Sequence, residues 1–149
     1  MSTEEIFNYL RVNDRLSTAG QPTEEQLRDV AADGFTAIIN LAPVNPPYTP
    51  ADEAGLAQAL GIAYYHIPVQ WNDPTDADFA AFEAAMRATA DDKLLIHCAA
   101  NFRVTAFYSL YARKHLGWTK EQGEAFRAQI WEGSEYPIWE EFVANKGAE

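Results

Sequence analysis

The chain has 149 residues, of which 48% are hydrophobic and 22% charged, and its net charge is −11. These values predict one domain over residues 1–149 with a buried core, and they argue against a nucleic-acid or anionic-membrane surface, which needs excess Lys and Arg. No apolar run approaches the roughly 18 residues of a membrane span, no signal peptide is visible at the N-terminus, and the single cysteine excludes an internal disulfide, so a cytoplasmic location is expected.

Apolar runs and helix-boundary residues alternate from the N-terminus onward. Residues 8–20 predict one or two short strands. Residues 22–34 predict a helix, because Gln26 stands three positions after Thr23 as in a capping box. A buried strand is expected over residues 35–42.

The same helix–strand pattern then occurs twice more. Helices are expected over 51–61 and 76–92, and each is followed by a strand, over 62–69 and 93–97. Helix–strand alternation at this spacing predicts an α/β fold with a mainly parallel central sheet, flanked by helices in a three-layer α/β/α arrangement.

The C-terminal third reads as helical. A helix is expected from about 103 to 115, followed by one that opens with a capping box at Thr119 and carries Ile130 and Trp131 on its apolar face. A last short helix follows Pro137.

In open α/β sheets, ligands bind beyond the carboxyl ends of the strands. The loops that leave those ends here are 19–21, 43–50, 70–74 and 98–102. If the strands are parallel, these loops converge on one rim, where a functional site is expected.

The last of these loops contains chemistry suited to anions. Cys98 stands between a strand and a helix, and Arg103 lies five residues later. Backbone N–H groups at a helix N-terminus attract anions and favour a thiolate, which is the reactive form of cysteine. The Arg103 guanidinium matches two phosphate oxygens. Two simpler interpretations stay open: Cys98 as a small buried core residue, and His97 as a strand-end side chain that holds a carbonyl.

The segment HCAANFRVT, residues 97–105, resembles the active-site loop of protein tyrosine and dual-specificity phosphatases. The wider context resembles a bacterial branch that is also found joined to metallo-β-lactamase-like hydrolases, in the segments RLSTAGQPTEEQL, GFTAIINL and YYHIPVQWNDPT. The resemblance runs from about Tyr9 to Phe142. It implies a cysteine-phosphatase-like fold and phosphate-ester hydrolysis through a phosphocysteine at Cys98.

The resemblance also implies roles for the rest of the loop. Phosphate would be held by Arg103 and by the backbone of Ala99, Ala100, Asn101 and Phe102. A supporting role is implied for His97 beside the thiol, for Thr105, which stands where the family has a hydroxyl that stabilises the thiolate, and for Asn40, which would brace the loop or simply end its strand.

One departure from the family pattern stands out. Only four residues separate Cys98 from Arg103, where the family has five, and Asn101 replaces the usual glycine. Asparagine is the non-glycine residue that best tolerates a left-handed backbone. Either the shortened loop still closes around phosphate, or Arg103 points elsewhere and activity is weak or lost.

Phosphate-ester cleavage needs an acid that protonates the leaving oxygen. Asp73, in the loop after the fourth expected strand, is the candidate, although Asn-Asp-Pro is also ordinary turn chemistry. Asp76 and Asp78 are weaker candidates, because acids are expected in a first helical turn.

The leading hypothesis is a phosphatase without metal or cofactor that acts on a phosphorylated protein or a small phosphoester, with neither nucleic acid nor membrane as partner. A rhodanese-like sulfurtransferase is the alternative, since CAANFR matches the length of that family's loop. Against it stand the AGQP segment and His97, and the absence from the sequence of the Asp-Val-Arg and Gly-His-Ile-Pro segments. A phosphate-binding module without catalysis is the third hypothesis.

Overall fold

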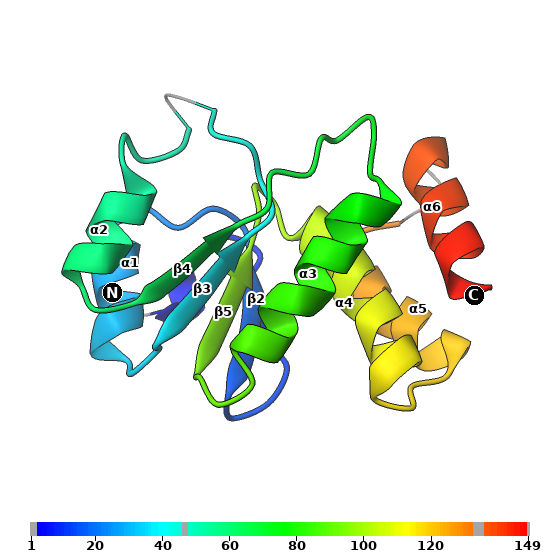
Figure 1. Ribbon diagram of the computed structural model, residues 1–149, viewed down its shortest axis with the longest axis horizontal. Helices are drawn as coiled ribbons and strands as arrows, with labels where there is room; N and C mark the ends of the chain where they lie inside the picture. The colour runs from blue at the N-terminus through cyan, green and yellow to red at the C-terminus, as the bar shows by residue number, and fades with distance from the viewer. Residues whose placement is uncertain (1–2, 46–47, 133–135, 149) are drawn as a thin grey trace.

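The computed structural model describes residues 3–45, 48–132 and 136–148 (Figure 1). Its elements in chain order are η1 (Thr3–Glu5), β1 (Leu10–Arg11), β2 (Leu16–Ala19), α1 (Glu24–Ala32), β3 (Ala37–Asn40), α2 (Glu53–Ala59), β4 (Ala63–His66), α3 (Asp76–Ala88), β5 (Leu94–His97), α4 (Phe102–His115), α5 (Lys120–Ala128) and α6 (Pro137–Gly147).

The five strands form one sheet in the order β1-β2-β5-β3-β4. All neighbours are parallel except β1, which pairs with β2 in the antiparallel sense. The central strand is β5, where His97 stands opposite Ala19 of β2 on one side and Asn40 of β3 on the other. The mainly parallel sheet is therefore confirmed, and the carboxyl ends of four strands lie at one edge.

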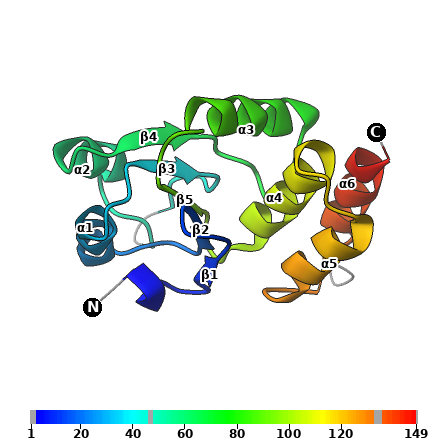
Figure 2. The ribbon, with the colours of Figure 1, turned by 90° about the horizontal axis from the view of Figure 1, so that it is seen from below.

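The sheet buries both faces, because successive side chains of a strand point to opposite sides. Leu94 and Ile96 face a core built with α3, α4, α5 and α6, whereas Leu95 faces a second core built with α1 and α2. Figure 2, which views the molecule from below, shows the helices on either side of the sheet. The predicted three-layer α/β/α arrangement is confirmed.

The helix starts follow the local sequence signals closely. Capping boxes open α1 at Thr23 and α5 at Thr119, as predicted, and a third opens α3 at Thr75. The strands are shorter than expected: β2 to β5 have four residues each.

One expectation about α5 is wrong. This helix ends at Ala128, so Ile130 and Trp131 do not lie on its face. The chain tightens after the helix, where Gln129 N–H donates to Phe126 O at 3.3 Å and Ile130 N–H to Arg127 O at 2.9 Å. The helical spacing of apolar residues in the sequence continues through that turn, although the helix itself ends before it. Within the described ranges, no helix has the length and apolar character needed to cross a membrane.

Candidate active site

Cys98 lies directly after the central strand, under the loop that joins β5 to α4. Its N–H donates to Ala19 O at 3.3 Å, so the pairing with β2 extends to the cysteine itself. Cys98 is 0% exposed, whereas Ala99 is exposed. The thiol therefore lies at the floor of a loop whose next residue faces solvent.

Asn101 provides the turn of the shortened loop. Its φ of 68° is left-handed, which agrees with the expectation for this position. Its Nδ2 donates to Thr18 Oγ1 and to Asn8 O, both at 2.9 Å, and Asn8 Nδ2 donates to Ala100 O, also at 2.9 Å. A glycine could adopt this turn but could not bind it to β2 and to the N-terminal segment.

The N-terminus of α4 is left open by its own cap. Thr side chains cap α1, α3 and α5, but Asn101 gives α4 no side-chain capping bond. The first intrahelical bond runs from Thr105 N–H to Asn101 O at 3.1 Å, so the N–H groups of residues 102–104 have no partner within the helix. Unpaired N–H groups and the positive end of the helix dipole together suit an anion.

Arg103 adds a full positive charge to that helix start. Its Cζ lies 5.5 Å from the centre of the Trp71 ring, in cation–π contact. Its Nε is buried and has no hydrogen-bond partner in the part of the chain that the structure describes. A buried donor without a partner costs about 1–3 kcal/mol. An oxyanion that accepts from this group would remove that cost.

Trp71 anchors the loop after β4 beside the start of α4, which follows the Cys98 loop. Its ring packs at centroid distances of 5.8 Å from Trp131 and 5.3 Å from Trp139. Trp139 Nε1 also donates to Trp71 O at 2.8 Å. Phe102, at the start of α4, stacks on Trp131 at 4.8 Å. One aromatic cluster therefore positions both the start of α4 and the loop that carries Asp73.

The three candidate acids have different surroundings. The Asp76 carboxylate lies 3.2 Å from Lys146 Nζ, and Asp78 closes the capping box of α3. Asp73 is exposed, and its carboxylate has no hydrogen bond or ion pair with another described residue. Of the three, Asp73 is the acid that no structural bond occupies, two residues from Trp71.

Thr105 is engaged with the backbone of the loop. Its hydroxyl donates to Asn101 O at 2.8 Å and accepts from Trp131 Nε1 at 3.0 Å. In this arrangement the hydroxyl proton is not available to the Cys98 sulfur. Thr105 supports the turn at Asn101 and links it to the aromatic cluster.

Glu53, which was not expected from the sequence, is the central polar residue on the other side of the loop. It begins α2 and is 7% exposed. Its Oε2 lies 2.6 Å from His97 Nε2, and its Oε1 accepts from Gln21 Nε2 at 2.7 Å. The residue after the end of β2 and the last residue of β5 therefore meet at one buried acid.

Asn40 contributes through this group and not by direct contact with the cysteine loop. Its Nδ2 donates to the Tyr64 hydroxyl at 2.9 Å, and its Oδ1 accepts from Ala42 N–H at 2.9 Å. The side chain holds the end of β3 in shape and orients Tyr64 toward Glu53.

The charge state of this group follows from its surroundings. Burial alone would raise the pKa of Glu53, but the His97 charge and the hydrogen bonds from His97, Gln21 and Tyr64 outweigh it and lower that pKa below its usual value. Burial raises the pKa of Tyr64, the Asn40 hydrogen bond opposes the rise, and the Glu53 charge adds to it. At neutral pH Glu53 is a carboxylate and Tyr64 keeps its proton.

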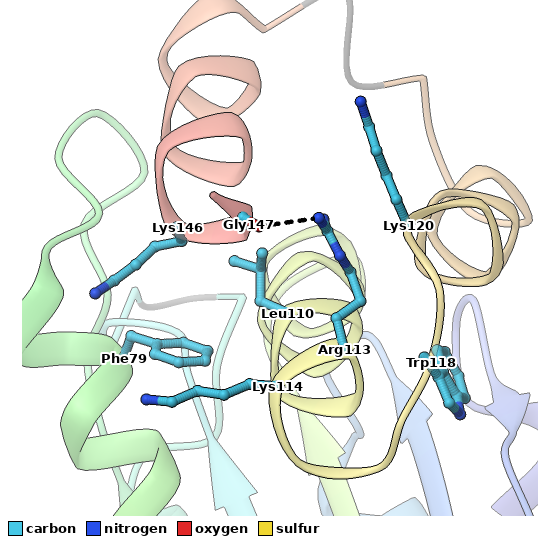
Figure 3. Close-up of a pocket in the computed structure, with 8 residues that line it drawn as sticks. All are labelled: Phe79, Leu110, Arg113, Lys114, Trp118, Lys120, Lys146 and Gly147. Atoms are coloured by element: carbon cyan, nitrogen blue, oxygen red, sulfur yellow. Dashed lines mark hydrogen bonds between the residues drawn. The ribbon is translucent and has the colours of Figure 1, made fainter. Parts of the chain in front are cut away.

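A hollow rich in cations lies elsewhere. A cavity of about 250 Å³ near the C-terminal ends of α4 and α6 is lined by Arg113, Lys114, Lys120 and Lys146, together with Phe79, Leu110, Trp118 and Gly147. Figure 3 shows Lys114 and Lys146 pointing toward α3, and Arg113 toward Gly147. These three cations bind Glu83, Asp76 and the Gly147 carbonyl.

This cavity is remote from the Cys98 loop. Arg113 stands about 16 Å along α4 from Phe102, at 1.5 Å per residue. Its cations hold α6 against α3 and α4 and oppose the negative ends of two helices. Among the described residues no group of three His, Cys, Asp or Glu side chains is placed to hold a metal ion.

Taken together, the rim loops provide parts with distinct chemical uses. A buried thiol lies under a loop at an open helix N-terminus. A guanidinium with an unpaired buried donor lies beside it, and a free carboxylate follows on the neighbouring loop. These are the parts needed to bind a phosphoryl group, attack it and protonate its leaving group.

Comparison with known proteins relates this geometry to others. Residues 8–114 match the family described as beta-lactamase hydrolase-like protein, phosphatase-like domain. Beta-lactamase hydrolase-like proteins of Xylella fastidiosa (strain 9a5c) and Agrobacterium fabrum (strain C58) are 36% identical over 103 and 104 residues, which are 66% and 68% of this chain. The matched regions are 23% and 24% of those proteins, so the chain spans about a quarter of their length.

Solved structures agree in fold. A putative phosphatase from Shewanella putrefaciens CN-32 aligns with a TM-score of 0.87 and 29% identity, covering 96% of this chain and 90% of its own. The core catalytic domain of the PP-IP phosphatase SIW14 from S. cerevisiae aligns with a TM-score of 0.75 and 15% identity, covering 93% and 85%. At that identity the likeness shows the fold alone, and the fold is the one that the Cys–Arg motif predicts.

Proposed function

Because the chain belongs to the phosphatase-like domain family of the beta-lactamase hydrolase-like proteins, we propose that it is a cysteine-dependent phosphatase of phosphate monoesters, built as one domain over residues 1–149. One observation carries the proposal. The uncapped start of α4 and the unpaired Nε of Arg103 leave an anion site directly after Cys98.

In the first step the Cys98 thiolate attacks phosphorus, and the bond from phosphorus to the ester oxygen breaks. Arg103 and the N–H groups of residues 99–103 hold the equatorial oxygens, over which the charge spreads in the transition state. Asp73 donates a proton to the leaving oxygen. The products are a phosphocysteine and an alcohol or phenol.

In the second step water attacks the phosphocysteine. The Asp73 carboxylate, now deprotonated, accepts a proton from that water, the sulfur–phosphorus bond breaks, and phosphate and the thiolate are released. Thr105 supports this step through its hydroxyl, which donates to the Asn101 carbonyl and so maintains the shape of the loop. Asp73 returns to its protonated form for the next cycle.

The substrate class is a phosphorylated protein, on tyrosine or on serine and threonine, or a small phosphoester. The overall charge of −11 disfavours heavily charged polyanions by long-range repulsion. A catalytic thiol must stay reduced, which supports a cytoplasmic site of action.

Activity assays on the purified protein test this function. Phosphate release from p-nitrophenyl phosphate in the presence of EDTA is expected for the wild type and not for Cys98→Ser. Sulfur transfer from thiosulfate to cyanide without phosphate release would instead establish the rhodanese-like chemistry. Vanadate binding with neither activity would establish a binding module. The complete burial of Cys98 would then explain why the thiol does not react.

A further inference from the structure

We propose that Glu53 is a positioning residue for the nucleophile: its carboxylate fixes His97, and His97 fixes the carbonyl of Cys98 and with it the loop. This inference rests on the proposed function only in taking the Cys98 loop as the reacting part. Glu53 itself touches neither the thiol nor a substrate in this arrangement.

Proton counting on His97 supports the assignment. His97 Nδ1 lies 3.2 Å from Cys98 O, and a carbonyl only accepts, so Nδ1 must carry a proton. Nε2 lies 2.6 Å from the Glu53 carboxyl, so a second proton is shared between these two groups. The histidine can therefore make both contacts only if the pair holds that second proton.

The second proton belongs on His97. Gln21 Nε2 donates to the Glu53 carboxylate at 2.7 Å, and a donor favours the ionised form of an acid, whose pKa is lowered here. The result is an imidazolium that is 0% exposed, directly before the nucleophile in the chain. The Glu53 carboxylate is the partner of the other ring nitrogen, at 2.6 Å, so it holds the ring in the orientation that makes the Nδ1 contact.

The charges around Cys98 determine what this pair does. Arg103 on α4 and the His97 ring on β5 are the basic side chains of the segment that carries Cys98. The carboxylates on the neighbouring elements are Glu53 at the start of α2, which contacts His97, Asp52, the exposed N-cap of that helix, and Asp73, which is also exposed. Tyr64 on β4 is neutral at neutral pH. Removing the Glu53 carboxylate therefore removes the group that holds the His97 ring, and with it the Nδ1 contact to Cys98 O.

The contact also joins segments far apart in the sequence. Glu53 and His97 are 44 positions apart, and Gln21 is a further 32 positions before Glu53. The carboxylate lies where the ends of β2 and β5 meet the start of α2. A change at the start of α2 should therefore reach the thiol without altering any group that contacts substrate.

The test compares Glu53→Gln with Glu53→Asp and with Glu24→Gln. Glu24 is a matched control, because it too is the first residue of a helix but is exposed at the start of α1. The readouts are the pH midpoint of Cys98 alkylation by iodoacetamide, the imidazole ¹⁵N shifts of His97, and kcat and KM for p-nitrophenyl phosphate.

For Glu53→Gln we expect loss of one His97 proton and a lower kcat with little change in KM. The pH midpoint of Cys98 alkylation should rise by about one unit, which corresponds to a tenfold lower thiolate fraction at a pH below the midpoint. Glu53→Asp should recover part of each effect, and Glu24→Gln should match the wild type. A folded Glu53→Gln variant with an unchanged midpoint and an unchanged His97 spectrum would overturn the proposal. Those two readouts need no turnover, so a wild type without phosphatase activity would refute the proposed function and leave this inference decided on its own.

Discussion

The side chains of Asn8 and Asn101 each donate to the backbone beside the other: Asn101 Nδ2 to Asn8 O, and Asn8 Nδ2 to Ala100 O, each at 2.9 Å. In the described part of the chain these are the two non-glycine residues with positive φ, at 53° and 68°. Two left-handed turns, 93 positions apart in the chain, therefore hold each other. The arrangement explains how a loop one residue short keeps a defined shape.

Asn101 should contribute to stability in two separable ways. Asn101→Gly keeps the left-handed turn but loses the bonds to Thr18 and Asn8, which should lower the free energy of unfolding by about 1–3 kcal/mol. Asn101→Ala loses the same bonds and adds left-handed strain of about 1–2 kcal/mol. Urea unfolding of both variants measures the difference. Equal stabilities would show that the backbone at this position relaxes out of the left-handed region.

Arg103→Lys should reduce kcat/KM for p-nitrophenyl phosphate by about 10²–10³-fold, because an ammonium cannot present the paired donors of a guanidinium to two oxygens. The matched control is Arg113→Lys, in the same helix but at the cavity shown in Figure 3. The control should keep the wild-type rate. A similar loss in both variants would point to a general effect on α4 and not to phosphate binding.

Asp73→Asn should lower kcat by about 10²–10⁴-fold if this carboxyl is the general acid. The loss should be greater for an alkyl phosphate than for p-nitrophenyl phosphate, since p-nitrophenolate leaves readily without a proton. Asp76→Asn, which removes only the pairing with Lys146, serves as the control. Rates that fall with Asp76 and not with Asp73 would move the acid to α3.

The Glu53–His97 pair should give stability a defined dependence on pH. The pKa of Glu53 is lowered in the folded state from 4.5, so its carboxylate stabilises the fold above that value, and this contribution is lost as pH falls through the folded pKa. The difference in unfolding free energy between wild type and Glu53→Gln should be full at neutral pH and shrink below about 4.5. A difference that grows on acidification would contradict the sign.

Gly20→Ala should disturb the site through contact with backbone. A Cβ there would lie 2.7 Å from Ala99 O and 2.9 Å from Phe7 O, neither of which can move alone. We expect a loss of about 1–3 kcal/mol in stability and a lower kcat. Gly123→Ala is the control, because its Cβ would meet the flexible Arg113 side chain and a helix interior favours alanine. Equal effects would mean that the Gly20 loop adjusts freely.

Local signals predicted much of this molecule. The capping boxes at Thr23 and Thr119 each form within four consecutive residues, so they could be predicted from the sequence alone. The left-handed turn at Asn101 could be predicted from its place in the Cys–Arg motif. The parallel sheet follows from the helix–strand alternation. The end of α5 was misplaced, since apolar periodicity does not register a turn made by backbone bonds.

Polar contacts between residues far apart in the chain could not be predicted from the sequence. Glu53 reads as an ordinary acid in the first turn of a helix, and nothing near it in the chain points to His97, 44 positions away. Thr105 was placed at the thiol by analogy, but Trp131 Nε1 reaches its hydroxyl from beyond α5. Such partners are decided by which strand ends meet, and that is a property of the assembled sheet.

The position of β5 has a consequence for folding. It inserts between β2 and β3, both earlier in the chain, so the sheet closes only after residues 94–97 are available. Until then the chain's one thiol is exposed to solvent and oxidants; afterwards it is 0% exposed. A pulse of thiol reagent at successive times during refolding would therefore measure when the central strand inserts. The fraction of Cys98 that becomes labelled is the readout, and no introduced probe is needed.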